Sequence, residues 1–509
     1  MVSALAVSIS RTETKALMLR PALALLVLSA LLTTVVPAKG QIPGAPVIPI
    51  LGDPLAADTS EFLGRPVEPN PVRQRWRPPQ NPFMAPDPNN NLHNDSYMTD
   101  AYRRLGPLGH DTETASTLLF RECGSVTFDS QGRIVTVCVG LDRPVLALLH
   151  PRTLATLAAY LLPLREISGD NPFTGFSGGG YFYLDHRGRA VIPTSTKHIV
   201  VVAQRPGPRF ERVADYDVSA VVGPGEGIVS ALPDWKGRIW FVSTAGDVGW
   251  VRRGDGSVHA TSLGEPIHNS FAVDETGGVF VVSDGALYRF EARRGRVRTV
   301  WRRPYPNTGE TKPGQTQAGS GTTPTLIARG NVAITDNADP MRVVVYRRSA
   351  RSGGRKVCSE PVFRRGASAT DQSLIAAGRS IITENNYGYS GITAVENGAT
   401  TSPGLQRVDV RKGRCRTVWR SSEVAPSVVP KVSLGAGLVY TYTKPADEGG
   451  DDNWYFTALD FHTGRTRFKR LAGSGLGFNN NYAPVTIGPD RAAYVGVLGG
   501  LALFRDRSR

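Results

Sequence analysis

A turn pattern that recurs along residues 112–509 constrains the fold more than any other feature of this sequence. The pattern is Asp-x-x-Gly between two runs of β-forming residues, as in Asp129–Gly132, which lies between Gly124–Phe128 and Ile134–Cys138. An Asp side chain can bond to the backbone of its own turn and Gly tolerates a positive φ, so each copy predicts a tight hairpin. Further copies begin at Asp185, Asp234 and Asp274, and weaker ones turn at Gly330, Gly378, Gly437 and Asp490.

The spacing of these turns is close to 50 residues. Successive turns lie 40 to 59 residues apart, and no helical pattern interrupts them. A period of this length, with several short strands in each repeat, is typical of β-propeller blades. We therefore predict an all-β fold, a β-propeller of eight four-stranded blades, with seven blades as the alternative if one repeat is irregular.

Each repeat should contain four strands, lettered A to D from the axis outwards. In the fourth repeat we expect them at Ser270–Val273, Val279–Ser283, Ala286–Glu291 and Arg296–Trp301. The last repeat ends after the run Leu501–Arg505, without a fourth strand. Because an unpaired strand edge invites aggregation, we expect the N-terminal segment Thr114–Phe120 to pair there and close the ring.

The residues before the repeats divide into three segments. Basic residues precede a 15-residue apolar run from Ala22 to Val36, which is followed by Ala38-Lys39-Gly40. This pattern predicts a secretory signal peptide over residues 1–40. A membrane span needs about 20 residues, so an uncleaved anchor is the lesser alternative. Residues 41–80 are rich in proline and predict an extended linker, whereas residues 81–111 hold more aromatic and Asn/Asp side chains and are expected to pack on the propeller domain, residues 112–509.

The formal net charge of the chain is +15. A basic balance can indicate nucleic-acid binding, but an exported protein rarely meets nucleic acid, and the basic residues are spread along the chain. We predict a secreted or extracytoplasmic protein with no nucleic-acid partner and no transmembrane span once the signal is cleaved. Weak association with an anionic envelope is the one role we assign to the charge.

Three segments carry a resemblance to a known family. Ala458–Phe468 reads Ala-Leu-Asp-Phe-His-Thr-Gly-Arg-Thr-Arg-Phe, and Gly295–Trp301 and Gly413–Trp419 are looser copies of its second half. The pattern resembles the repeat of quinoprotein-type propellers, whose enzymes bind pyrroloquinoline quinone. Residues 112–509 also resemble exported bacterial quinoprotein-like propellers of unassigned activity. The resemblance implies the propeller architecture but gives little indication of a catalysed reaction.

The motifs that would support an enzyme are missing from the sequence. Quinoprotein dehydrogenases typically combine a calcium-bound quinone with a Trp platform, a catalytic Asp and often a disulfide between adjacent cysteines. This chain has no pair of adjacent cysteines, and it also lacks a Cys-x-x-Cys-His motif for a haem. Gly388-Tyr-Ser-Gly391 lacks the spacing of a nucleophile elbow. The eight histidines and four cysteines show no metal-ligand spacing. The sequence therefore argues against pyrroloquinoline quinone and favours a protein that is not an enzyme.

The loops offer a candidate binding site. In a propeller the B–C loops and the loops leading into each A strand open on one face, and loops on a rigid scaffold often carry function. The fifth and sixth repeats concentrate carboxylates and amides in these loops. Oxygen-rich side chains suit calcium or the hydroxyl groups of a sugar, although the same residues also form ordinary turns. The candidate ligand-binding residues are Asp336, Asn337, Asp339, Asp371, Glu384 and Asn385, with His268 and Asn481 from other repeats and the segment His93–Asp95 above them, and the candidate calcium ligands are Asp336, Asp339 and Glu384.

The four cysteines suggest two disulfides. Cys123 and Cys138 are equidistant from the middle of the Asp129–Gly132 turn, so the hairpin should place them opposite one another, near disulfide distance. An exported protein can keep such a bond. Cys358 and Cys415 occupy equivalent outer strands of neighbouring repeats and form the less certain second pair.

Two classes of function remain open at this point. The first is a ligand-binding or envelope-associated scaffold that presents its B–C face to a small ligand, a glycan or a protein. The second is an extracytoplasmic enzyme, either quinone-dependent or metal-assisted at Asp336 and Glu384. We favour the first, because a fold alone does not imply an activity.

Overall fold

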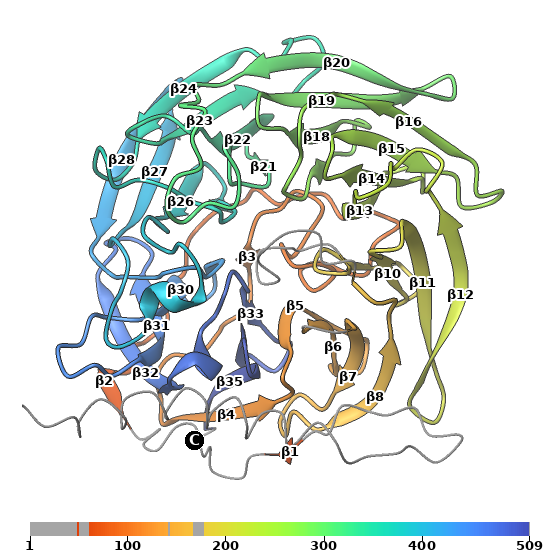
Figure 1. Cartoon of the computed structure of the whole chain (residues 1–509). Coiled ribbons are helices and arrows are strands. Elements are labelled where there is room, and N and C mark those ends of the chain that lie inside the picture. Colours follow the sequence, from red (N-terminus) through yellow and green to blue (C-terminus); the bar gives the residue numbers. More distant parts are fainter. Residues whose placement is uncertain (1–47, 50–60, 141–142, 166–177, 508–509) are drawn as a thin grey trace, which may run out of the picture. The chain divides into compact units, whose positions relative to one another are not determined.

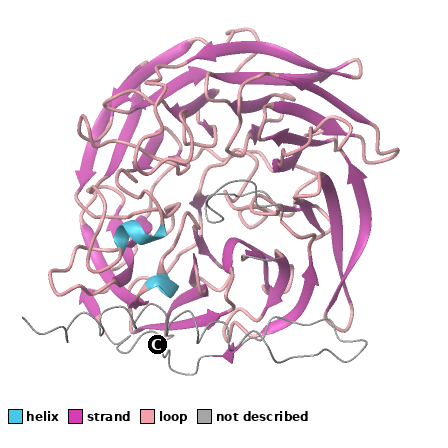
Figure 2. Ribbon diagram, viewed as in Figure 1, coloured by secondary structure: helices cyan, strands magenta, loops and turns pink. Residues whose placement is uncertain are grey.

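The Asp-x-x-Gly turns join the first two strands of successive sheets in the computed structural model, which describes residues 48–49, 61–140, 143–165 and 178–507. Within these residues the strands form eight sheets that follow one another round a central axis (Figures 1 and 2). Each sheet contains four antiparallel blade strands. The prediction of an all-β propeller with eight four-stranded blades is therefore confirmed, and the seven-bladed alternative is wrong.

The first four blades are continuous in sequence. Their strands, from the axis outwards, are β5 (Glu122–Phe128), β6 (Ile134–Val139), β7 (Val145–Leu149) and β8 (Thr156–Leu161) in blade 1; β9 (Tyr183–Leu184), β10 (Ala190–Pro193), β11 (His198–Arg205) and β12 (Arg209–Asp217) in blade 2; β13 (Ile228–Pro233), β14 (Ile239–Ser243), β15 (Asp247–Val251) and β16 (Val258–Ser262) in blade 3; and β17 (Ala272–Val273), β18 (Val279–Val282), β19 (Ala286–Arg293) and β20 (Arg296–Pro304) in blade 4.

Blades 5 to 7 follow the same order, and blade 7 gains a strand at each edge. Their strands are β21 (Thr325–Ile327), β22 (Asn331–Thr335), β23 (Arg342–Arg347) and β24 (Lys356–Pro361) in blade 5; β25 (Ile375–Ala377), β26 (Ser380–Glu384), β27 (Leu405–Arg411) and β28 (Arg414–Ser421) in blade 6; and β29 (Lys431–Ser433), β30 (Leu438–Thr443), β31 (Asn453–Asp460) and β32 (Thr466–Ser474) in blade 7, flanked by β3 (Ala101–Tyr102) inside and β2 (Phe62–Gly64) outside. Two short 3-10 helices, η1 (Ile392–Val395) and η2 (Leu476–Phe478), lie in loops.

Blade 8 combines the two ends of the repeat region. Its inner strands are β33 (Val485–Ile487), β34 (Ala493–Val497) and β35 (Gly500–Asp506), and β4 (Thr112–Leu118) pairs antiparallel with β35 in a register that sets Ser116 opposite Ala502. The strand β1 (Ile48–Pro49) pairs with the outer side of β4. The paired segment thus begins and ends two residues before the expected Thr114–Phe120.

The turn residues explain why these hairpins form. In the Asp185 turn, one carboxylate oxygen accepts the amide protons of Arg187 and Arg189 at 2.9 and 3.1 Å, and the other pairs with the Arg189 guanidinium at 2.6 Å. Gly188 has a φ of 69°, which glycine adopts without a Cβ clash. The same Asp–Arg pair recurs in the Asp129 and Asp234 turns. A single carboxylate therefore holds both the backbone and the following strand.

The faces of the blades bury the core, and only the outermost strands are exposed. All five residues of β7 are buried, whereas the outer strand β12 contains only exposed and part-buried residues. This is why the A, B and C strands read as continuous apolar runs and the D strands do not.

The repeat motif that resembles quinoproteins has a packing role between neighbouring blades. The Trp419 indole of blade 6 donates a hydrogen bond to the Phe461 carbonyl of blade 7 at 2.8 Å. A Cβ at Gly464 would lie 2.6 Å from the same ring, so the Thr-Gly of the motif leaves room for the tryptophan. Trp301 lies over Gly354 of blade 5 in the same way.

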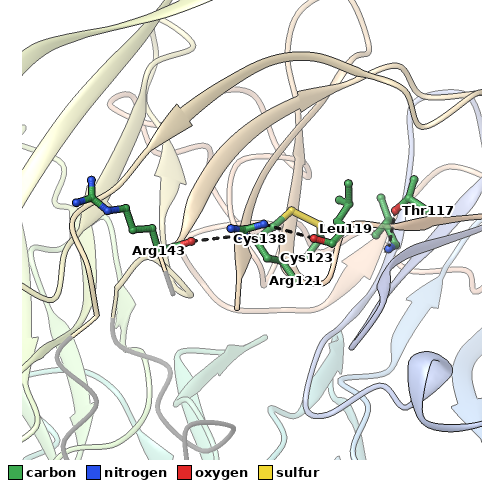
Figure 3. The surroundings of a disulfide bond; sticks show 7 residues. Thr117, Leu119, Arg121, Cys123, Cys138 and Arg143 are labelled. Atoms are coloured by element: carbon green, nitrogen blue, oxygen red, sulfur yellow. Dashed lines mark hydrogen bonds between the residues drawn. A yellow bond between two sulfur atoms is a disulfide. The ribbon is translucent and has the colours of Figure 1, made fainter. Parts of the chain in front are cut away.

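Both expected disulfides are present. Cys123 and Cys138 face each other across β5 and β6, beside the segment Thr117–Arg121 (Figure 3). The Cys358–Cys415 bond joins the outer strands of blades 5 and 6. These bonds fit an extracytoplasmic protein. The signal-peptide prediction falls on residues 1–40, which lie outside the described residues; among those described, none belongs to a helix with the length and hydrophobicity of a membrane span.

We predict that the bond between blades contributes more stability than the bond within a hairpin. The two pairs are separated by 57 and 15 residues, and in the chain-entropy description a larger loop restricts the unfolded chain more. Replacing Cys358 and Cys415 by Ala should lower the free energy of unfolding by about 4 kcal/mol, and replacing Cys123 and Cys138 by about 3 kcal/mol. Urea titrations of the two double variants measure this, and a larger loss for Cys123→Ala with Cys138→Ala would contradict the prediction.

Candidate functional site

Residues 81–102, here called the inner segment, run along the axis-facing edges of several inner strands. Carbonyls of Asn90, Ser96, Tyr97, Thr99 and Asp100 accept backbone hydrogen bonds at 2.7 to 3.1 Å from the inner strands of blades 2, 4, 5, 6 and 7 respectively. The segment ends in β3, which pairs in parallel with β29. Buried backbone donors need partners, so this segment satisfies strand edges that would otherwise face the axis.

A buried ionic network anchors the inner segment to the blades. His93 Nδ1 lies 3.1 Å from an Asp100 carboxylate oxygen, and Lys431 of β29 pairs with the same carboxylate. The Lys431 ammonium also donates to the Leu92 carbonyl at 2.6 Å. All three charged or titratable side chains are fully or almost fully buried, and burial lowers the pKa values of both His93 and Lys431.

The network includes an arrangement that is similar to a catalytic triad. The Ser373 hydroxyl lies 3.3 Å from His93 Nε2, and Thr323 lies 3.5 Å from the same nitrogen. Ser, His and Asp in this order can act as nucleophile, base and orienting acid. Here the serine is 95% buried and Asp100 is already paired with Lys431. We therefore interpret the cluster as structural: it holds the inner segment against the blades.

Asp371 lies in the loop that leads into the inner strand of blade 6 and gathers several polar groups. One of its carboxylate oxygens accepts from the Thr316 amide and hydroxyl at 3.0 and 2.7 Å, and the other accepts from Gln317 Nε2 at 3.1 Å. The side chain is only part-buried. Desolvation nevertheless raises its pKa to about 6, against the lowering effect of the bonds from Thr316.

Side chains from other blades interact electrostatically with this carboxylate. The charge of His268 lowers the Asp371 pKa. Burial raises the pKa values of Tyr181 and Tyr482, and the Asp371 charge raises them further. The imidazole of His268 also lies 3.5 Å from Asp284. We call the set Tyr181, His268, Thr316, Gln317, Asp371 and Tyr482 the rim.

Asn386 connects Glu384, another predicted residue of blade 6, to Asp371 by hydrogen bonds. The Asn386 amide donates to Glu384 Oε1 at 3.0 Å, and its oxygen accepts the Asp371 amide proton at 2.9 Å. Glu384 is buried, and desolvation raises its pKa well above the ordinary value. Asn385 instead spans loop carbonyls of Ala367 and Pro403, which is a structural role.

The predicted residues of blade 5 form local turn contacts. Asp336 is fully buried, accepts the Arg342 amide proton at 2.8 Å, and has its pKa raised to about 6 by burial. Asn337 donates to Asn307 and to the Glu310 carbonyl. Asp339 accepts the Gly366 amide proton at 2.7 Å. These side chains hold loops together and, within the described part of the chain, share no hydrogen-bond partner with Asp371.

Asn481 lies in the loop leading into the inner strand of blade 8. Its side chain accepts from the Tyr389 hydroxyl at 3.2 Å and donates to Glu122 at 3.2 Å. His93–Asp95, expected above the site, is buried against the inner strands.

No group of three His, Cys, Asp or Glu side chains in the described part of the chain lies close enough to hold a metal ion. Asp336, Asp339 and Glu384 each have different hydrogen-bond partners. Calcium binding therefore stays a prediction from the sequence.

Sequence reasoning missed Thr316, Gln317, Asn386 and Tyr181. The first two lie in the long connection between blades 4 and 5, whose composition, rich in Gly, Thr and Gln, was the available signal. Asn386 directly follows the predicted Asn385, and its hydrogen bonds to Asp371 and Glu384 distinguish it from that neighbour.

Comparisons with known proteins show one relative in sequence and several solved structures with a similar fold. No family model matches the chain. An uncharacterized protein of Archaeoglobus fulgidus is 30% identical over 314 residues, covering 55% of this chain and 61% of the archaeal protein, so this chain spans about three fifths of that relative. The quinohemoprotein alcohol dehydrogenase of Comamonas testosteroni matches with a TM-score of 0.53 and 10% identity over 83% of this chain and 81% of its own. This similarity concerns the fold. The designed protein Ika8 also matches, at a TM-score of 0.46 and 10% identity, over 74% of this chain and 94% of its own.

The side chains present do not fit the quinone site that the resemblance implies. The resemblance implies a Trp platform, whereas Trp301 and Trp419 lie between blades and Trp240, Trp250 and Trp454 are buried within blades 3 and 7. The other two, Trp235 and Trp76, lie in the A–B turn of blade 3 and in the extended segment Asn70–Trp76. Neither disulfide joins adjacent cysteines. The inner segment occupies the axis-facing edges of several inner strands instead. We therefore derive no redox step for this chain.

We predict that Asp100 and Lys431 are strongly coupled in stability. Removing one partner of a buried ion pair leaves an uncompensated charge and typically costs about 3–5 kcal/mol. Lys431→Met alone should therefore destabilise strongly, and combining it with Asp100→Asn should cost clearly less than the sum of the two single variants. Chemical denaturation of the four proteins completes this double-mutant cycle, and additive losses would contradict the assignment.

We also predict that stability falls as the pH rises from about 4 to about 7. Desolvation raises the pKa of the buried Asp95 from 3.8 to about 7, despite its hydrogen bonds from Thr99 and Tyr97. In this window the folded protein keeps a proton that the unfolded chain has released, so rising pH favours unfolding until the folded pKa is passed. The Asp95→Asn variant should show a smaller difference in urea midpoint between pH 5 and pH 8, two conditions that cover the upper part of this window.

The exposed Asp447 of a blade 7 loop provides the matched control, because Asp447→Asn removes a carboxyl without changing the inner segment. This variant should keep the wild-type pH dependence. An unchanged pH dependence in Asp95→Asn would refute the role of Asp95.

Proposed function

We propose that this protein is an extracytoplasmic binding propeller that holds a hydroxyl-rich ligand, a glycan, at the rim. The observation that carries the proposal is the environment of Asp371, a part-buried carboxyl fixed by Thr316 and Gln317. Its raised pKa, about 6, allows the group to accept or donate a hydrogen bond near neutral pH. Sugar hydroxyls both donate and accept, so such a group suits them.

The neighbouring side chains support the same ligand class. The half-buried Tyr181 supplies an aromatic ring and a hydroxyl group, and the buried Gln317 amide orients Asp371. A few polar groups set among aromatic side chains on a rigid scaffold are typical of small-molecule sites. The inner segment and its buried network fix the inner strands from which the rim loops extend, which limits the entropy lost on binding.

The disulfides and the predicted signal peptide support an extracytoplasmic location, where a glycan ligand or an envelope partner is accessible. The archaeal relative is uncharacterized, so the choice of ligand rests on the rim alone.

The proposal predicts that one carboxyl controls glycan affinity. The purified protein is first applied to an array of neutral and anionic oligosaccharides, and the best binder is then titrated calorimetrically. Asp371→Asn should weaken binding by about tenfold or more, because hydrogen bonds to a charged or fixed partner are worth about 1.5 kcal/mol each.

Glu448→Gln, an equivalent change at an exposed residue of a blade 7 loop, should leave the affinity within about twofold of the wild-type value, as expected of a surface substitution. Equal effects of the two substitutions, or no binding to any oligosaccharide on the array, would reject the proposed function.

A further inference from the structure

A pocket of about 850 Å³ lies on the opposite face of the propeller, where the A–B turns are located. Its walls come from the A–B turns of blades 5 and 6, from β27, and from the C–D turn of blade 7. The extended segment Asn70–Trp76 forms the remaining side. This segment is fixed by backbone bonds from Asn70 to Ala436 at 2.9 Å and from Val72 to Leu434 at 2.8 Å.

The lining of this pocket is strongly basic. It contains six arginines and a single carboxylate, Asp409; the arginines are Arg73, Arg75, Arg329, Arg379, Arg407 and Arg411. Asp409 is already paired with Arg407 at 2.9 Å and with Arg411 at 3.1 Å. Among the residues that the structure describes, the other four guanidinium groups form no ion pair.

One guanidinium group is rigidly held. Arg407 is buried, donates to the Phe461 carbonyl at 3.1 Å and to the Ser380 hydroxyl at 3.0 Å, and lies 4.2 Å from the centre of the Phe461 ring. The exposed arginines Arg329 and Arg379 extend from the turns of two different blades. The positive charges therefore surround the pocket and do not form a row along one strand.

The alternative is an ordinary solvated surface, since the whole chain carries 59 Lys and Arg residues against 44 Asp and Glu. Elsewhere some exposed arginines have acidic partners, as Arg212 has Asp215 and Arg252 has Asp255, whereas others, such as Arg298 of β20, form no ion pair with any described residue. Here several arginines without partners converge on a concave surface, which concentrates the positive potential and attracts anions.

We propose that this pocket binds a small polyanion that carries at least two phosphate or carboxylate groups. Guanidinium groups match both oxyanions with two parallel hydrogen bonds. A single anionic group would satisfy one or two arginines, whereas arginines from the Asn70–Trp76 segment and from blades 5 and 6 require charges spread across the ligand. The site is separate from the rim, so the proposal does not depend on the glycan function.

The test uses calorimetric titration of the full chain with tripolyphosphate and, separately, with citrate, at about 0.15 M salt, where long-range surface attraction is largely screened. At least one of the two should bind, and the tighter binder identifies the oxyanion type. The double variant Arg329→Ala with Arg379→Ala should weaken that binding by about tenfold or more. The Asp371→Asn variant of the rim should bind the anion as the wild type does.

A matched double variant separates a site from general electrostatics. Arg209→Ala with Arg298→Ala removes the same charge from exposed positions of β12 and β20 and should change the affinity by less than about twofold, as distant surface substitutions do. Failure of both anions to bind, or an equal loss in the two double variants, would overturn the proposal.

Discussion

The backbone pairing between the inner segment and the inner strands is the constraint on which the rim depends. Without it, the axis-facing edges of the inner strands of blades 2, 4, 5, 6 and 7 would lack the partners that residues 81–102 supply. The buried Lys431–Asp100 pair fixes this segment in one position, because a shift would leave a charge without a partner in a low-dielectric interior. The loops that carry Asp371 and Asn386 extend from strands held in this way.

The two faces of the propeller differ in their electrostatic character. The rim places a part-buried carboxyl among tyrosines and amides, and desolvation keeps part of its population neutral near pH 6. The opposite face surrounds a pocket with arginines whose single acidic neighbour is already paired. A polar, nearly neutral ligand and a polyanion would therefore each find one face suitable.

The sequence predicted the repeat architecture well because the signals are local. An Asp, a Gly and an Arg within five residues determine the A–B turns that begin at Asp129, Asp185 and Asp234, and the register after the first of them places Cys123 opposite Cys138. The candidate site was harder to predict. Asp336 and Asp339 are of a residue type that often binds ligands, but their carboxylates accept hydrogen bonds from backbone amides of nearby loops. Asp371 differs from them through Thr316 and Gln317, which are more than fifty residues away in the chain.

The sequence by itself determined the β-propeller, its period, the turn chemistry and the Cys123–Cys138 pair, because hairpins are specified by residues close together in the chain. Only the tertiary structure decided where the inner segment lies, that Arg407 and Asp409 share a pocket with Arg329 of blade 5 and the segment Asn70–Trp76, and that Glu384 is buried beside Asn386. These outcomes depend on desolvation and on contacts between distant segments. Neither leaves a periodic pattern in the sequence, so each becomes visible only when the blades are assembled.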